Sequence, residues 1–88
     1  MDKEKLYKLR SEATHIKPMI NVGKNGVTDQ LILELKKAIK DNHLVKVKVL
    51  KSASYEDEDG IDGIAEKLAS ATKATVIDVR GHSVVLYR

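Results

Sequence analysis

The sequence predicts a compact single domain over residues 1–88 with an α/β fold of the α+β type, in which helices pack on a four-stranded mixed sheet in the order αβαβαββ. Three observations predict this fold class. Apolar residues recur at spacings of three and four in three separate stretches, as in helices that bury one stripe. Residues 45–49 alternate strictly between Val and Lys, as in a strand that buries one face. Two β-rich runs, 74–79 and 83–87, are joined by the short glycine-containing connection 80–82, which is typical of a hairpin.

The first part of the chain is expected to alternate helix, strand and helix. A first helix is expected over residues 2–15, with a buried stripe that consists of Leu6, Leu9, Ala13 and Ile16. Pro18 restricts the residue before it to extended backbone, so the helix should end there and a short strand should follow over 19–22. After a tight glycine loop, the hydroxyl of Thr28 should cap a second helix that runs to about Asp41.

The strand 45–49 should pair in parallel with 19–22 through a right-handed crossover over the second helix, and the last two strands should be antiparallel. Residues 52–60 are acidic and lack apolar periodicity, so we expect a solvated connection that enters a third helix around 57–59. The apolar stripe of that helix consists of Ile61, Ile64, Ala65, Leu68, Ala69 and Thr72.

The composition excludes several classes of protein. The chain has no cysteine, which excludes disulfides, thiolate zinc sites and a thiol nucleophile and suits a reducing compartment. No apolar run approaches the roughly 18 to 20 residues that span a bilayer, so no membrane partner is expected. The N-terminal residues lack the apolar core of a signal peptide. We therefore expect a cytoplasmic protein, and a monomer.

Positive charge is concentrated in one half of the chain. Residues 1–51 hold 12 Lys and Arg against 6 Asp and Glu, a balance of +6, whereas residues 52–88 hold 4 against 7, a balance of −3. A one-sided field of this kind favours an anionic partner and speeds its encounter, although a solvated lysine surface gives the same numbers.

The loop Gly23-Lys24-Asn25-Gly26 is the strongest candidate binding site in the sequence. A glycine loop between a strand and a helix N-terminus brings together free backbone N–H groups and the positive end of the helix dipole, and phosphate is the natural ligand. Its glycines allow conformations closed to other residues, and Lys24 adds a charge. The alternative is an ordinary turn, in which Gly23 only ends the strand. The spacings of a P-loop and of a dinucleotide fold are both missing.

The segment 15–28, HIKPMINVGKNGVT, and the segment 44–48, LVKVK, together resemble the CRM domain, the chloroplast RNA splicing and ribosome maturation family. The likeness is to the stand-alone members of the YhbY type. The shared pattern is a Lys-Pro before the first strand, GxxG, a Thr-capped helix and an I/V-K-V-K strand, and 84–88 is similar to that family's last strand. The resemblance covers nearly the whole chain, but the acidic segment 56–59 does not match it.

The resemblance implies a fold similar to the C-terminal domain of bacterial translation initiation factor three, and association with pre-ribosomal particles and their proteins. We expect a non-enzymatic RNA-binding protein without a cofactor, which binds structured ribosomal RNA and has a role in ribosome maturation. Its GxxG loop should clamp backbone nucleotides as a KH loop does. The expected RNA-binding residues are Gly23, Lys24, Asn25, Gly26, Lys17, Lys46 and Lys48, with Arg10, Lys36, Lys37 and Arg80 in second rank.

Other kinds of site have weaker support. His15, His43 and His82 show no metal-binding spacing, so no metal is expected. With no Phe or Trp and three Tyr, base stacking on an aromatic platform is poorly supported, and recognition should depend on backbone and shape. Two alternatives stay open. One is a protein-interaction module of a ribonucleoprotein assembly, without direct RNA contact. The other is an enzyme acting on a phosphorylated small molecule, for which no nucleophile or base is evident.

Overall fold

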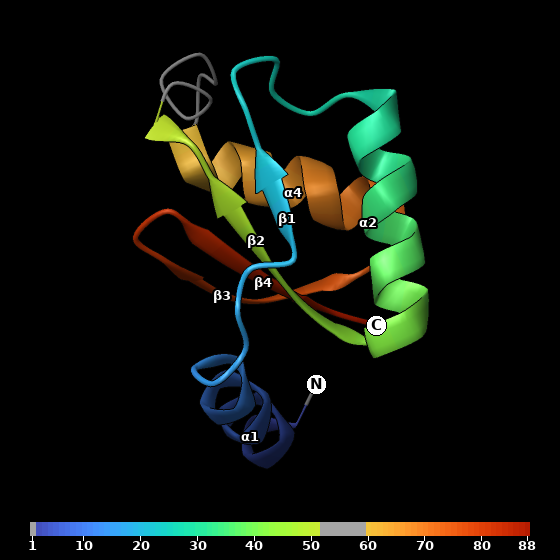
Figure 1. Cartoon of the computed structure of the whole chain (residues 1–88). Helices are drawn as coiled ribbons and strands as arrows, with labels where there is room; N and C mark the ends of the chain where they lie inside the picture. The colour runs from blue at the N-terminus through green and yellow to red at the C-terminus, as the bar shows by residue number, and fades with distance from the viewer. Residues whose placement is uncertain (1, 52–59) are drawn as a thin grey trace.

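The computed structural model describes residues 2–51 and 60–88 (Figure 1). The elements follow the predicted order, which confirms the α+β class with its four-stranded mixed sheet. They are α1 Lys3–Ala13, β1 Ile20–Val22, α2 Asp29–Asn42, β2 Leu44–Val49, α4 Gly60–Thr72, β3 Thr75–Arg80 and β4 Ser83–Tyr87. The acidic connection was predicted over 52–60, and its residues 52–59, with the entry into the third helix, lie outside the described residues. Gly60, the last residue of that stretch, is the first residue of α4.

Most element boundaries lie within one residue of the prediction, and two of the differences have a local cause. The first helix ends at Ala13 and not near His15, because the amides of Thr14, His15 and Ile16 donate to carbonyls three residues back and not four, so the last turn is tighter than an α-helix. Arg80 was expected in the hairpin connection, which is wrong, because it pairs with Ser83 as the last residue of β3. The connection therefore consists of two residues and begins at Gly81, whose φ of 59° suits such a tight turn.

The sheet has the strand order β1-β2-β4-β3. β1 pairs with β2 in parallel and β3 pairs with β4 in antiparallel fashion, as predicted. β4 also pairs with β2 in antiparallel fashion, and this pairing joins the two halves of the sheet. The register of β3 shifts between Val76 and Asp78, so Ile77 is an extra residue in that strand, a β-bulge. The strands nearest the middle of the sheet, β2 and β4, carry residues that face the core on both sides.

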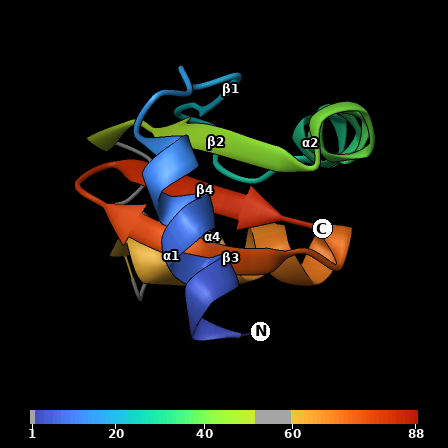
Figure 2. The same cartoon turned by 90° about the horizontal axis from the view of Figure 1, so that it is seen from below.

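Helices cover the two faces of the sheet unequally (Figure 2). On one face, α2 and α4 bury the main core with the valines of β2, and Leu35 and Leu68 at its centre are completely buried. On the other face α1 packs alone, and its buried residues join a smaller cluster that consists of Leu9, Ala13, Leu44, Ile77 and Val85. Because one helix cannot cover a whole sheet, part of this second face stays exposed, including Lys48.

Within the described residues, no helix is both long and apolar enough to cross a membrane.

Candidate nucleic-acid interface

The loop 23–26 is a tight turn that closes on itself through one hydrogen bond, from the Gly26 amide to the Gly23 carbonyl at 2.9 Å. Gly26 has a φ of 70°, in the left-handed region that favours glycine. Gly23 does not require that freedom: its φ is not in this region, and an added Cβ would meet Leu50 at an ordinary 3.9 Å. The expectation that both glycines adopt conformations closed to other residues therefore holds for Gly26 alone. Lys24 and Asn25, at the tip, are exposed.

The start of α2 keeps two backbone amides available beside this turn. Thr28 is the N-cap, as predicted, and its hydroxyl accepts a hydrogen bond from the Leu31 amide at 3.1 Å. The Ile32 amide is also bonded, to the Thr28 carbonyl. The exposed Asp29 and Gln30 donate no backbone hydrogen bond to any described residue. These amides lie at the positive end of the helix dipole, where an anion is favoured.

The loop and the first turns of α2 line a shallow hollow of about 220 Å³. Its lining residues are Asn21, Gly23, Lys24, Asn25, Gly26, Thr28, Gln30, Leu31 and Glu34. The side-chain charges here do not favour an anion, since Lys24 is opposed by Glu34 and Asp29 adds a second carboxylate in the first turn. A polyanion held at the loop therefore needs positive charge from a neighbouring surface.

A row of polar residues crosses the sheet from this loop on the face that α1 covers only in part. The register pairs Asn21 with Lys48, Lys48 with Ser83, and Ser83 with Arg80. Directly paired residues lie on the same face, so the row extends over three strand spacings, about 15 Å. Asn21 also lines the loop hollow, and Ser83 and Arg80 line a second groove. The row thus connects the two.

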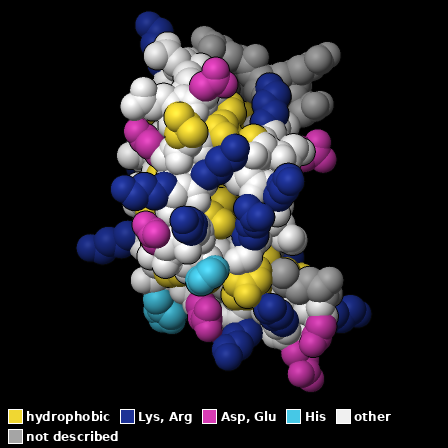
Figure 3. Space-filling model, turned by 90° about the vertical axis from the view of Figure 1, so that its right-hand side faces the viewer, with side chains coloured by type: hydrophobic (Ala, Val, Ile, Leu, Met, Phe, Trp, Pro, Cys, Tyr) yellow, Lys and Arg dark blue, Asp and Glu magenta, His cyan; other side chains and the backbone are white. Residues whose placement is uncertain are grey.

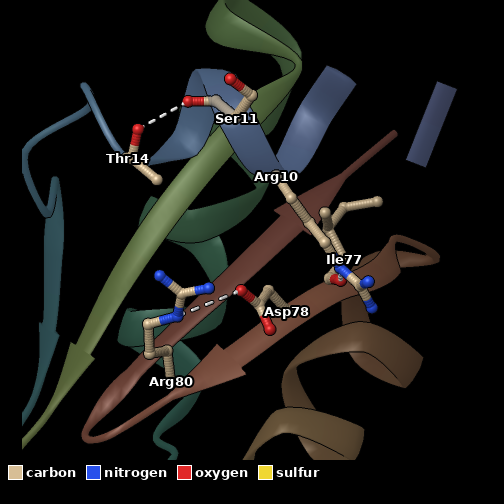
Figure 4. Close-up of polar contacts among 6 residues, drawn as sticks. All are labelled: Arg10, Ser11, Thr14, Ile77, Asp78 and Arg80. Atoms are coloured by element: carbon tan, nitrogen blue, oxygen red, sulfur yellow. Dashed lines mark hydrogen bonds and ion pairs between the residues drawn. The ribbon is translucent and has the colours of Figure 1, made fainter. Parts of the chain in front are cut away.

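This second groove, of about 130 Å³, lies between the end of α1 and the sheet. Its lining residues are Arg10, Ala13, Thr14, Lys46, Asp78, Arg80, Ser83 and Val85. Figure 4 shows its two arginines in different roles. The Arg10 Nε donates to the Ile77 carbonyl at 3.0 Å and so fixes α1 to the bulge. The Arg80 Nε lies 3.7 Å from the Asp78 Oδ2, and the Arg80 side chain is 78% exposed. Arg80 is the more available cation.

The remaining predicted residues lie apart from these two sites. Lys17 is exposed in the segment between α1 and β1, and it lines neither hollow. Lys36 and Lys37 are exposed on α2, on the side of the molecule where Lys and Arg side chains gather in Figure 3. Asn21 and Ser83 were not among the predicted RNA-binding residues. Only the strand register brings them beside Lys48, and no local pattern marks them.

No group of three or more His, Cys, Asp or Glu in residues 2–51 and 60–88 could hold a metal ion.

The family model of the CRS1/YhbY (CRM) domain matches residues 1–88, the whole chain. The chain belongs to the CRM family. The resemblance stated from its motifs is thereby confirmed.

Relatives of this CRM domain include a protein of Methanocaldococcus jannaschii and one of Bacillus subtilis, both named as probable RNA-binding proteins. The first is 44% identical over 81 residues, which cover 91% of this chain and 58% of the relative. The second is 34% identical over 80 residues, which cover 91% of this chain and 79% of the relative. The CRM domain described here thus spans less than two thirds of the length of the archaeal protein.

A solved structure shares the fold of this CRM domain. It is the solution structure of a hypothetical Staphylococcus aureus protein, described as a candidate RNA-binding protein. The TM-score is 0.82 at 30% sequence identity, over 100% of this chain and 88% of the other.

Proposed function

We propose that this CRM domain binds RNA through the loop 23–26 and the open face of the sheet beside it. The observation that carries the proposal is the polar row Asn21-Lys48-Ser83-Arg80, which joins the loop hollow to the groove beside α1. The names of the archaeal and bacterial relatives support RNA as the partner. Binding, and not turnover, is the mechanism.

The loop would hold one phosphate of the RNA backbone. The amides of the exposed residues Asp29 and Gln30 offer hydrogen-bond donors, and Lys24 at the tip of the loop offers a cation. Lys48 and Arg80 would bind further phosphates along the row, while Asn21 and Ser83 donate or accept at sugar or phosphate oxygens. Lys46 and Arg10 add positive charge at the groove. Contacts of this kind fix position but do not read bases, so we expect weak sequence preference.

We propose that the target is structured ribosomal RNA and that the role is in ribosome maturation. The domain would bind this RNA within pre-ribosomal particles. Crosslinking in cells, followed by sequencing of the attached RNA, tests this assignment. Recovery of mainly ribosomal precursor fragments is the expected result. Recovery of messenger RNA alone would contradict the ribosomal target and leave RNA binding itself intact.

The substitution Lys24→Ala tests the loop. Because the Lys24 side chain is exposed at the tip of the turn, its removal should leave the fold intact and weaken binding to all RNA sequences alike. The slope of log affinity against log salt should fall by roughly 0.7 to 1, the value for a single lysine–phosphate interaction. Fluorescence anisotropy at several salt concentrations measures it.

Lys3→Ala is the matched control, because Lys3 is an exposed lysine on α1, at the end of the molecule away from the loop (Figure 1). It should leave the slope unchanged. Equal slopes for both variants and the unmodified protein would remove the loop from the interface.

The alternative of a protein-interaction module would use exposed apolar side chains. The described large apolar residues with the greatest exposure are Tyr7, Met19, Leu33 and Leu50. They come from four separate segments of the chain, and none lines the hollows described above. Failure to bind any RNA at low salt would favour this alternative.

A further inference from the structure

A third hollow, of about 580 Å³, lies at the C-terminal half of α2, away from the loop. Its lining residues are Lys36, Ile39, Lys40, His43, Thr72 and Arg88. They come from α2, from the end of α4 and from the residue after β4, so three distant segments of the chain meet there. Figure 3 shows this side of the molecule, with Lys and Arg side chains gathered over it.

The lining of this hollow contains three cations and no carboxylate. The other hollows described in the molecule each include at least one acidic residue: Glu34 at the loop, Asp78 at the sheet groove, and Glu4 with its neighbours beside α1. None of Lys36, Lys40 and Arg88 forms a salt bridge with a described carboxylate. The positive charge here is therefore uncompensated by side chains.

Helix ends do not account for all of this charge. Cations often neutralise helix C-termini, and both α2 and α4 end at the hollow. Each end carries about half a negative charge, so the two together offset about one of three positive charges. A main-chain carboxylate on Arg88 would offset one more and still leave the hollow positive. The excess charge favours an anion.

The positions of the cations also favour a ligand. Lys36 and Lys40 are four residues apart on α2, where like charges face each other and destabilise a helix unless an anion lies between them. Three hydrogen bonds hold Arg88 in place. Its amide donates to the His43 carbonyl at 3.1 Å, its Nη1 donates to the Thr72 carbonyl at 3.3 Å, and its main-chain oxygen accepts from the His43 Nδ1 at 3.3 Å. Its Nη2 and Nε form no hydrogen bond with the described residues and are free to donate to a ligand.

We propose that this hollow, formed by Lys36, Lys40 and Arg88, is a second phosphate-binding site that holds the phosphodiester backbone of the same RNA. The inference rests on the proposed function, in which the loop holds the first phosphate. From Thr28 to Lys40 the helix rises about 18 Å, at about 1.5 Å per residue. At roughly 3.4 Å per stacked nucleotide, about five nucleotides separate the two sites. α2 thus presents one phosphate site at each end.

A length series of single-stranded RNA tests the proposal. For the unmodified protein, affinity should rise when the RNA is lengthened from about 4 to about 12 nucleotides, because only the longer RNA reaches both sites. In the double variant Lys36→Ala/Lys40→Ala this rise should be smaller, because the longer RNA then gains only the contacts of the sheet row. The salt slope on the longer RNA should fall by about 0.7 for each lysine that binds a phosphate. Lys36→Arg/Lys40→Arg should keep both.

Lys3→Ala/Lys8→Ala is the matched control, since both are exposed lysines of α1 that do not line the hollow, and the same charge is removed. It should keep most of the rise with length. A Lys36→Ala/Lys40→Ala variant that retains the full rise, or a Lys3→Ala/Lys8→Ala variant that loses as much, would overturn the second site. Both lysines of the hollow are exposed, so the variants should fold, and a far-ultraviolet circular dichroism spectrum checks this.

The same measurements distinguish this inference from the proposed function. If Lys24→Ala has no effect while the double variant loses affinity, the proposed phosphate site at the loop is wrong and the proposed site in the hollow is supported. If no RNA binds at all, inorganic phosphate is titrated into the protein. The chemical shifts of the Lys40 and Arg88 amides then show whether phosphate binds in the hollow. Saturable shifts would assign the hollow to a free phosphate and overturn RNA as its ligand, and the absence of shifts would overturn the site itself.

Discussion

At the scale of single residues, one glycine of the GxxG loop has a conformational role that the other lacks. Gly26 occupies the left-handed region with a φ of 70°, and its amide closes the turn onto the Gly23 carbonyl. An L-residue there encounters a clash between its Cβ and the backbone. Gly23 has room for a side chain, since Leu50 lies at 3.9 Å from the position of a Cβ. Both positions of the motif are glycine, but only position 26 has a backbone conformation that requires glycine.

We expect Gly26→Ala to lower the free energy of unfolding by about 1 to 2 kcal/mol, the cost of a left-handed conformation. Gly23→Ala, the matched control, should change it by no more than about 0.5 kcal/mol. Urea denaturation of both variants measures the difference. Equal losses in the two variants would contradict the assignment of the strained position to Gly26.

At the scale of elements, the bulge in β3 and helix α1 depend on each other. The extra residue Ile77 turns its side chain into the small cluster under α1, and its carbonyl accepts a hydrogen bond from the Arg10 guanidinium at 3.0 Å. A bulge leaves its extra residue out of the ladder, so that carbonyl needs a partner from elsewhere. Arg10 supplies it from the last turn of α1, and this fixes the helix beside the groove.

Arg10→Ala should therefore lower the free energy of unfolding by about 1 to 2 kcal/mol, in the range of a hydrogen bond to a charged group. Arg80→Ala is the control from the same groove. Its ion pair with Asp78 is exposed and should contribute about 0 to 0.5 kcal/mol. Hydrogen exchange of the α1 amides checks the cause, because only the Arg10 variant should exchange faster there. Faster exchange in neither variant would mean that Arg10 does not hold the helix.

At the scale of the whole molecule, the two faces of the sheet carry cores of unequal size. The main cluster is sealed by α2 and α4, and the smaller one by α1 alone. A domain of this length has a total stability of only about 4 to 13 kcal/mol, at roughly 0.05 to 0.15 kcal/mol per residue. Loss of one large side chain from the main core therefore removes a considerable part of it.

Leu35→Ala should lower the free energy of unfolding by about 3 to 5 kcal/mol, because Leu35 is 0% exposed at the centre of the main cluster. Leu9→Ala, at 7% exposed in the smaller cluster, should cost about 2 kcal/mol, since α1 can shift toward the void. Chemical denaturation compares the two. A larger loss for Leu9→Ala would show that the smaller core limits the stability of the domain.

The proposed interface also belongs to this scale, because its parts come from segments that are far apart in the chain. The loop residues are contiguous, and so the sequence could identify them. The row from Asn21 to Arg80 and the hollow at Arg88 combine residues up to about sixty positions apart. Lys46 and Lys48 were selected from the alternation of their strand and from its likeness to the family pattern. The partial cover by α1 leaves Lys48 exposed and Lys46 half-buried.

Local sequence patterns were enough to predict the order and type of the elements, the parallel pairing of β1 with β2, the Thr28 cap and the tight turn at the loop. The elements, the cap and the turn depend on apolar periodicity, on proline and glycine, and on short-range hydrogen bonds, all of which are local in the chain. The parallel pairing follows from the order strand, helix, strand, because a helix between two strands of one sheet is the usual parallel crossover. The strand register, the bulge at Ile77 and the convergence of Lys40 with Arg88 arise only in the folded chain. They follow from how the sheet and helices bury apolar surface together, and no local stretch of sequence contains that information.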